Sequence, residues 1–339
     1  MVFFMNKIGK RILVLIAIFV ALGVGCASYD ISDLEHPQKS DSDWHRISTG
    51  DGATQSADAA PEPASPHTEP TPAKSSSQRV SGAPQPNAYA LVIGIEDYRN
   101  LTPTPGARGD AERFSDMLRH TLGVPQNNIH LITDSDATRG DILAKLSWLQ
   151  NNVPSDGRIF FYFSGHGTPN VETGASYLLP YEGQPETLEY TGLPVDDVLS
   201  SLEESEARDI LAFVDSCFSG SGDRSALPEG TRPLVPVQQT TPEPRVALFS
   251  SSAAAEISGN APDSEEGLFT QHLIRAIAEG RADIDGDGQI SLAEVKQYVA
   301  PRVSRDAQRA NRNQNPELSI SEELGDPSNI ILLWGLPRD

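Results

Sequence analysis

From residue 88 onward, apolar runs of strand length alternate with amphipathic stretches. Short runs of this kind predict strands, and the stretches between them predict helices. Regular alternation of the two is typical of a mainly parallel sheet with helices on both faces. Several runs are almost continuously apolar, as expected for strands that are covered on both sides. The predicted strands are 89–95, 128–133, 158–165, 209–216, 245–252 and 329–335.

The amphipathic stretches predict five helices, and Asp or Ser stands near several of their starts, where such residues cap a helix. The predicted helices are 110–122, 139–152, 195–203, 267–279 and 292–299. The alternation breaks at 221–244, which is polar and rich in proline, so we expect a long loop there. The order of the elements places the domain in the α/β class, with a six-stranded, mainly parallel sheet between two helical layers.

The segment 27–87 differs in composition from the rest of the chain. It has hardly any apolar run and is rich in Ser, Ala, Asp, Glu and Pro. Such a segment cannot bury enough apolar surface to fold. We expect a flexible tether, which would span about 40 Å or more, followed by one folded domain at 88–339.

The first 26 residues have the layout of a signal peptide. Three basic residues precede an apolar run over 12–24, which is shorter than the roughly 20 residues that a spanning helix needs. The run ends in LGVGC, which resembles a bacterial lipoprotein processing box, although Leu22 stands one position further from Cys26 than usual. We expect Cys26 to be lipidated and the protein to be anchored in the bacterial cell envelope, facing the periplasm. A plain cleaved signal and a short anchor helix are the alternatives.

The charge and the number of cysteines exclude some classes of function. The formal net charge is -21, with a sequence pI of about 4.6. The chain therefore repels nucleic acid and attracts cationic peptides and metal ions, so nucleic-acid binding is a poor hypothesis. There are two cysteines, Cys26 and Cys217, which exclude a disulfide framework within the folded domain.

Cys217 and His166 stand at the ends of two predicted strands, in ILAFVDSCFSG and RIFFYFSGHG. Ligands of open α/β sheets bind at the carboxyl ends of strands. The two residues are 51 positions apart, enough for one crossover unit, so their strand ends can be neighbours. An imidazole beside a thiol can generate the nucleophilic thiolate. A buried cysteine that merely fills the core is the alternative.

The stretches YALVIGI, GARGDAERF, FFYFSGHG and FVDSCFSG together resemble the caspase/metacaspase clan of cysteine peptidases, in particular its bacterial metacaspase-like branch. The resemblance covers about 88–335 and implies a caspase-like three-layer α/β/α sandwich. It further implies that His166 and Cys217 form the catalytic dyad. The backbone N–H groups of Gly167 and Cys217 would form the oxyanion hole.

The same resemblance assigns a specificity pocket to Asp110, Ser164 and Asp215. Two carboxylates in one pocket favour an Arg or Lys side chain of the substrate and reject aspartate. In the alternative interpretation, Asp110 is only a helix N-cap and Asp215 a turn former. Phe218 replaces the histidine of many metacaspases, and Arg108-Gly109 replaces Cys-Asn, so the rim of the pocket departs from the family pattern.

The stretch DIDGDGQISLAE at 283–294 matches an EF-hand loop, with Gly288 at position 6. Calcium is a hard cation that prefers such oxygen ligands. Because EF-hands usually work in pairs and we find one, a structural clip is favoured over a sensor. A solvated acidic turn that caps the next helix is the alternative. The expected ligands are Asp283, Asp285, Asp287, the carbonyl of Gln289, and Glu294, with Ser291 contributing through water.

These features favour a lipid-anchored, calcium-binding cysteine endopeptidase that cleaves peptides and proteins after Arg or Lys. The main alternative is a catalytically silent caspase-like scaffold stabilised by calcium. A thiol redox protein would need a partner cysteine, which the domain lacks. A preference for acidic residues would need a basic pocket, which we do not find in the sequence.

Overall fold

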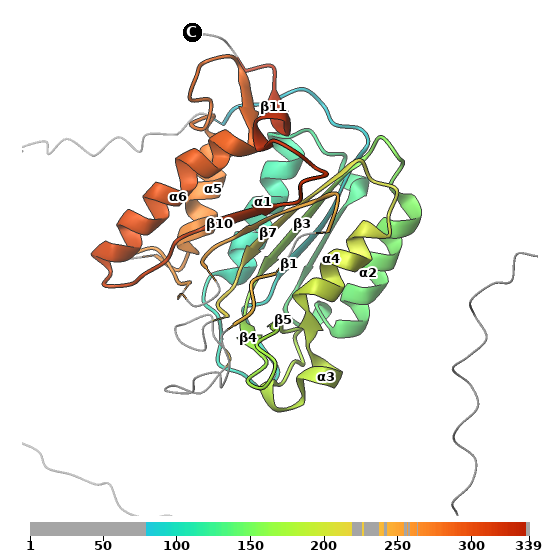
Figure 1. Ribbon diagram of the computed structural model, residues 1–339, viewed down its shortest axis with the longest axis vertical. Coiled ribbons are helices and arrows are strands. Elements are labelled where there is room, and N and C mark those ends of the chain that lie inside the picture. The colour runs from blue at the N-terminus through green and yellow to red at the C-terminus, as the bar shows by residue number, and fades with distance from the viewer. Residues whose placement is uncertain are drawn as a thin grey trace, which may run out of the picture. The chain divides into compact units, whose positions relative to one another are not determined.

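The computed structural model describes residues 79–218, 226, 237–240, 243–253, 256, 258–262 and 264–336 (Figure 1). The predicted signal peptide with Cys26, the tether up to residue 78 and most of the loop 221–244 lie outside the described residues. Residues 79–87 are in contact with the domain. The Val80 N–H donates to the Ala278 carbonyl (2.9 Å), and the Ala83 N–H donates to the Trp334 carbonyl (2.9 Å).

A six-stranded sheet in the order β10-β8-β7-β3-β1-β2 forms the centre of the domain. Neighbouring strands are parallel from β8 through β2. The sequence predicted these five strands to within two residues at each end. Their bounds are Ala88–Gly94 (β1), Ile129–Thr133 (β2), Arg158–Ser164 (β3), Asp209–Asp215 (β7) and Val246–Ser250 (β8).

The sixth strand of this sheet is not the one that the sequence predicted. The run predicted at 329–335 forms β11 (Ile331–Trp334), which pairs antiparallel with β9 (Gln289–Ser291) in a separate two-stranded sheet. The sixth position belongs to β10 (Glu317–Ile320), antiparallel to β8. All four β10 residues are only half-buried, as at the edge of a sheet, so β10 lacks the continuous apolar run that marks the central strands.

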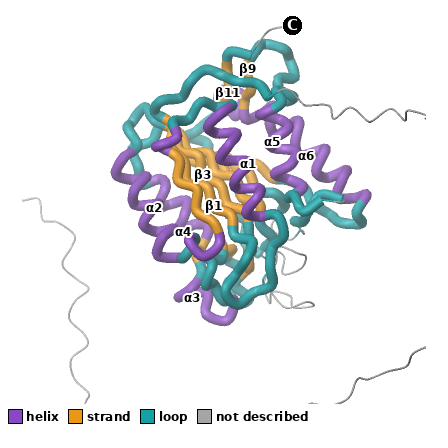
Figure 2. The backbone as a smooth tube through the Cα atoms, turned by 180° about the vertical axis from the view of Figure 1, so that it is seen from behind, coloured by secondary structure: helices purple, strands orange, loops and turns teal. Residues whose placement is uncertain are grey.

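Helices cover both faces of the sheet, as the resemblance implied (Figures 1 and 2). One layer holds α1 (Ala107–His120), α5 (Leu268–Ala278) and α6 (Leu292–Arg309), and the other holds α2 (Arg139–Asn152) and α4 (Val195–Glu203). Each layer encloses its own apolar core against the sheet. Alternate residues of β3 serve the two cores, with Phe160 and Tyr162 in one and Phe161 and Phe163 in the other.

Two helix bounds differ from the prediction. Helix α1 begins at Ala107, so Asp110 is its fourth residue and not its N-cap, a position that Gly106 takes. Helix α6 continues ten residues beyond the predicted end at 299, with Pro301 inside it. The helix continues through this residue although a proline lacks the N–H that an interior helical position would donate.

A small antiparallel sheet lies at the carboxyl edge of the central one. It contains β4 (Gly167–Pro169), β5 (Ser176–Leu178) and β6 (Leu193–Pro194), and the short helix α3 (Leu188–Thr191) precedes β6. Short 3-10 turns occur at Gln126–Asn128, Asp134–Asp136, Pro185–Thr187 and Pro327–Asn329. No helix in the described ranges is both long and apolar enough to cross a bilayer.

A buried ion pair ties the amino ends of β3 and β7 together. Arg158 donates to both carboxylate oxygens of Asp209 (2.5 and 2.9 Å) and to the Ile331 carbonyl of β11 (2.5 Å). Burial raises the pKa of Asp209, but hydrogen bonds and charge from Arg158 and Arg208 outweigh it and hold this pKa below its ordinary value. The pair therefore fixes the amino ends of β3 and β7. The SGHG and DSCFSG motifs lie at the carboxyl ends of the same two strands.

Candidate active site

The SGHG and DSCFSG motifs lie side by side where β3 and β7 leave the sheet. Ser164 of β3 is the register partner of Asp215 of β7. Beyond the strands, the Gly165 N–H donates to the Asp215 carbonyl (3.4 Å) and the Ser216 hydroxyl donates to the Gly165 carbonyl (3.0 Å). The predicted neighbourhood of the two strand ends is thus present in the structure.

Gly167 lies against the chain around Cys217. A methyl group at this position would stand 2.5 Å from the Ser216 Oγ and 2.9 Å from the Cys217 carbonyl oxygen. Distances this short are not tolerated, so the backbone can approach this closely only because residue 167 has no side chain. The structure therefore brings together the two residues whose N–H groups were expected to hold an oxyanion.

The imidazole of His166 is fixed by residues of the turn after β1. Its Nε2 lies 2.8 Å from the Thr102 carbonyl oxygen, and its ring packs on Tyr98 with the ring centres 4.8 Å apart. The Tyr98 hydroxyl also accepts from the His166 backbone N–H (2.6 Å). Because a carbonyl oxygen can only accept, Nε2 carries the proton of the neutral ring and Nδ1 keeps the lone pair. Nδ1 is therefore the nitrogen that can act as a base.

Cys217 is fully buried, and its thiol donates to the Glu256 carbonyl oxygen (3.6 Å). The Glu256 carboxylate accepts from the Asn315 backbone N–H (2.7 Å) and side-chain amide (2.5 Å). A sulfur buried in this way is not accessible to a peptide, so the structure holds the cysteine in a closed arrangement.

Asp110 lies inside the domain, with a cation bound to it. One carboxylate oxygen accepts from Arg113, one turn later in α1 (2.6 Å), and the other from the Gly267 N–H before α5 (3.0 Å). Arg113 also lies 3.5 Å from Glu266. Asp110 therefore anchors the start of α5, and the adjacent guanidinium offsets its negative charge.

Asp215 is also fully buried, and two hydroxyl groups donate to its carboxylate. Ser258 donates to one carboxylate oxygen (2.9 Å) and Thr270 of α5 to the other (2.8 Å). Ser164, its register partner, is likewise fully buried. The three expected pocket residues thus lie in the core at the carboxyl edge, and both acids bond to the first turn of α5 or the residue before it.

The larger of the two described cavities, about 690 Å³, is not the catalytic cleft. Arg158 and Asp209 line it, and they stand at the amino ends of β3 and β7. A cavity of about 40 Å³ lies at the catalytic edge, next to Phe218 and Ser252.

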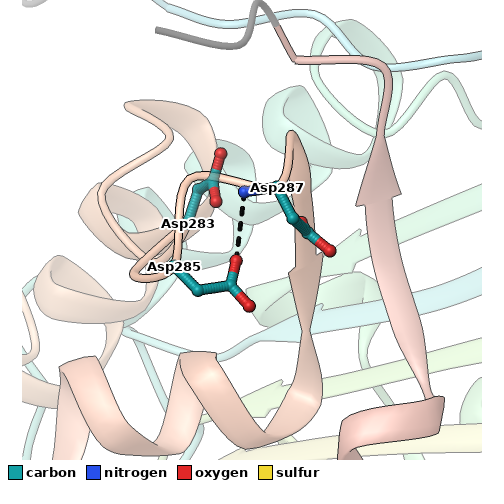
Figure 3. A group of neighbouring side chains, drawn as sticks. All are labelled: Asp283, Asp285 and Asp287. Carbon is teal, nitrogen blue, oxygen red and sulfur yellow. Dashed lines mark hydrogen bonds between the residues drawn. The ribbon is translucent and has the colours of Figure 1, made fainter.

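The loop 283–294 gathers acidic side chains between α5 and α6 (Figure 3). One carboxylate oxygen from each of Asp283, Asp285 and Asp287 lies within 4.8 Å of the others. The Asp287 N–H donates to Asp285 (3.1 Å), and the Gly288 N–H donates to Asp283 (3.2 Å). This crowd of hard oxygen donors fits calcium chemically.

Glu294 takes part in a second set of contacts at the end of the same loop. It accepts from the Ile284 N–H (3.1 Å) and forms a capping box with Ser291 at the start of α6. Gln289 and Ser291 belong to β9, which pairs with β11. The strand within this loop, β9, is therefore covered by β11.

The strand order, the two helical layers and the Cys–His pair at adjacent strand ends define a class of α/β protein with candidate thiol chemistry. The model of the caspase domain, peptidase family C14, matches residues 87–324. The chain belongs to this family.

Individual relatives match over shorter stretches. Metacaspase-1A of Aspergillus oryzae is 30% identical over 174 residues, which are 44% of this chain and 42% of the relative. Metacaspase-1 of Plasmodium falciparum is 32% identical over 160 residues, 43% of this chain and 26% of the relative. The chain thus spans less than half the length of these curated relatives. A Geobacter sulfurreducens protein of known crystal structure shares the fold, with a TM-score of 0.50, 17% identity, and coverage of 74% of this chain and 98% of that one.

Sequence reasoning missed the residues that hold the site. Tyr98 and Thr102 lie in a turn at the carboxyl edge, where position alone could have suggested a role but not which atoms reach His166. Thr270 gave a clearer signal, because it is a polar residue on the apolar face of α5 that also carries Leu273 and Ile277. Glu256 gave none, since its contacts depend on the tertiary fold.

The closed arrangement predicts slow alkylation of Cys217. In the full chain with Cys26→Ser, Cys217 is the sole thiol, and iodoacetamide labelling followed by mass spectrometry reports it alone. We expect labelling of the native protein at neutral pH to be at least about tenfold slower than in concentrated urea, because the reagent cannot reach a buried thiol. Equal rates in the two conditions would contradict the buried position.

Proposed function

We propose that this protein is a cysteine endopeptidase in which Cys217 is the nucleophile and His166 the base. The observation that carries the proposal is the direct bonding of the two motifs at the carboxyl ends of β3 and β7, with the proton of His166 assigned to Nε2. That tautomer leaves Nδ1 able to accept the thiol proton. Family membership supports the same chemistry.

In the proposed reaction, the Cys217 thiol first leaves the Glu256 carbonyl and gives its proton to His166 Nδ1. The thiolate attacks the peptide carbonyl carbon, and the N–H groups of Gly167 and Cys217 stabilise the developing oxyanion. His166 then gives the proton to the leaving amine, and an acyl-enzyme remains. Water, deprotonated by His166, hydrolyses this thioester and restores the thiol.

We propose Arg or Lys at the cleaved position, because two carboxylates lie near this edge of the sheet. Arg113 is bound to Asp110, and Ser258 and Thr270 donate to Asp215. A guanidinium or ammonium group entering a pocket with a carboxylate gains charge-assisted hydrogen bonds. An acidic side chain would be repelled.

Peptide hydrolysis tests both proposals. With fluorogenic peptides that carry Arg, Lys or Asp at the cleaved position, we expect the full chain to cleave after Arg and Lys only. Cys217→Ala and His166→Ala should each lower kcat/KM by at least about a thousandfold, because the nucleophile and its base work only together.

Thermal unfolding of the variants is the control for folding. Cleavage that persists in Cys217→Ala would exclude the dyad, and preferential cleavage after Asp would exclude the acidic pocket. A folded wild-type chain that cuts no peptide, with or without calcium, would favour the second candidate, a catalytically silent scaffold. The full burial of Cys217 is the observation in favour of that candidate.

We also propose that the loop 283–294 binds calcium through Asp283, Asp285, Asp287, Gln289 and Glu294. The clustering of the three aspartate oxygens supports this. A bound cation would offset the repulsion between these carboxylates and so stabilise the connection between α5 and α6. Since the loop strand β9 is already paired with β11, we expect stabilisation of the fold and not a large opening motion.

Calcium titration checks this proposal by a readout other than activity. At calcium about a hundredfold above Kd, mass action adds about 2.7 kcal/mol to the free energy of unfolding, which raises Tm by roughly 5–10 °C in a domain of this size. Asp283→Asn with Asp285→Asn should abolish the shift. The matched control Asp116→Asn, at an exposed acid of α1, should keep it. The same shift in the double variant would contradict binding at the loop.

We further propose that Cys26 is lipidated and anchors the protein in the bacterial cell envelope, on the basis of the LGVGC sequence alone. In bacteria fed a fatty acid that carries a clickable label, the full chain should acquire the label and fractionate with membranes. Cys26→Ser should lose both properties. A wild-type chain that is released in soluble, unlabelled form would contradict lipidation.

A further inference from the structure

Asp134 stands at the carboxyl edge of the central sheet, directly after β2. The last residue of β2, Thr133, is the register partner of Gly94, the last residue of β1. The carboxylate of Asp134 therefore lies beside the turn that leaves β1. One of its oxygens accepts from the backbone N–H groups of Glu96 (2.9 Å) and Asp97 (3.0 Å). These two bonds join the end of β2 to the turn after β1.

Arg108 of α1 holds the other carboxylate oxygen of Asp134 (2.8 Å). The same guanidinium lies 3.7 Å from Asp97 and 3.9 Å from Glu96. Only 15% of the Asp134 side chain is exposed, so its bonds are partly shielded from water. Arg108, at which the sequence departs from the metacaspase pattern, thus contacts three acids around the turn after β1.

The backbone of Asp134 has a conformation that few residues with a side chain adopt. Its φ is 47°, in the left-handed region, which Asp and Asn tolerate better than most residues do. Such a conformation persists only where the surrounding structure holds it, and it often marks a functional site. In Asp134, this conformation accompanies a carboxylate that is bonded to the turn and to Arg108.

The turn after β1 holds the imidazole of His166 at two points. The Thr102 carbonyl oxygen lies 2.8 Å from Nε2, and the Tyr98 ring packs on the imidazole. The Thr104 N–H donates to the Glu96 carbonyl (2.8 Å), so the residue bonded to Asp134 and the residue that holds His166 belong to one closed turn. A displacement of this turn would move the Thr102 carbonyl away from Nε2.

We propose that Asp134 is a positioning residue for His166, which acts by fixing the turn after β1. The inference rests on the proposed function, because it concerns the orientation of the proposed base. The bond from Nε2 to the Thr102 carbonyl keeps Nδ1 available for the thiol proton. Asp134 does not transfer a proton itself, since it acts through two backbone N–H groups of the turn.

Peptide hydrolysis by Asp134→Gly is the first test. The variant removes the carboxylate, and glycine adopts a φ of 47° without strain. The turn keeps its bond from the Ile95 N–H to the Ser164 carbonyl (2.9 Å), so we expect the chain to fold. For a peptide with Arg at the cleaved position, kcat should fall at least about tenfold, because misplacing a catalytic group by about 1 Å can cost about a hundredfold. KM should stay within about twofold, since the side chains of the proposed pocket are unchanged.

Two further variants separate positioning from other effects. Asp134→Asn keeps an oxygen that can accept both N–H groups and tolerates the same φ, so kcat should stay within about threefold of wild type. Asp136→Ala changes an exposed acid of the same 3-10 turn and should leave kcat unchanged. If Asp134→Gly does not fold, Asp134→Ser replaces it, because the shorter serine side chain does not reach both N–H groups.

A second readout does not depend on activity. The His166 ring is fully buried and its Nε2 is bonded to a carbonyl, so we expect slow exchange of the Nε2 proton with water and a visible ring N–H signal by NMR. In the full chain with ¹⁵N-labelled histidine, His166→Gln assigns this signal among the seven histidines. The signal should persist in Asp134→Asn and weaken strongly in Asp134→Gly, while thermal unfolding reports whether each variant is folded.

The outcomes are distinct. A lower kcat and a weakened ring signal in Asp134→Gly, with both retained in Asp134→Asn, support the inference. Wild-type kcat in folded Asp134→Gly overturns it and leaves the proposed peptidase standing. A lower kcat with an intact ring signal also overturns it, because the imidazole is then held without Asp134. If the wild-type chain cuts no peptide, the proposed function fails, and the ring signal alone decides whether Asp134 positions the imidazole.

Discussion

The parallel pairing of β3 with β7 is the constraint on which the site depends. Its register sets Ser164 opposite Asp215. Just beyond the strands, Gly165 is hydrogen-bonded to Asp215 and to Ser216. A shift by one residue would turn the side chains of one strand to the opposite face. The shift is opposed at the amino ends by the bidentate Arg158–Asp209 pair and along the strands by apolar side chains committed to two separate cores. Fold and site thus share one determinant.

The sequence was informative wherever a local pattern carried the information. Continuous apolar runs located the five parallel strands, and the two motifs at strand ends located the candidate dyad. The run at 329–335 misled because apolar character shows that a strand is buried but not which sheet receives it. The edge strand β10 was missed for the converse reason, since its residues are half-buried and its signal is weak.

The partners of the site residues were less accessible to sequence reasoning, because they depend on contacts over long separations. Asp110 and Gly267 are 157 positions apart, and Asp215 and Thr270 are 55 apart. Asp110 was expected to contribute to a specificity pocket, and the structure shows that Arg113 on the same helix is bound to it. A separation of three residues in a helix could have suggested that pair from the sequence.

Helix α5 connects the two chemically distinctive regions of the molecule. The residue before it and its first turn bond to Asp110 and Asp215, while its last turn leads into the acidic loop at 283–294. Its 11 residues correspond to about 16 Å of helix, which is short and rigid enough to move as one body. Its packing against α1 and α6 lets the loop and the pocket share one support. A cation held in the loop would restrain the end of this support that lies away from the pocket. The expected consequence is a more uniform position for the carboxylates of Asp110 and Asp215.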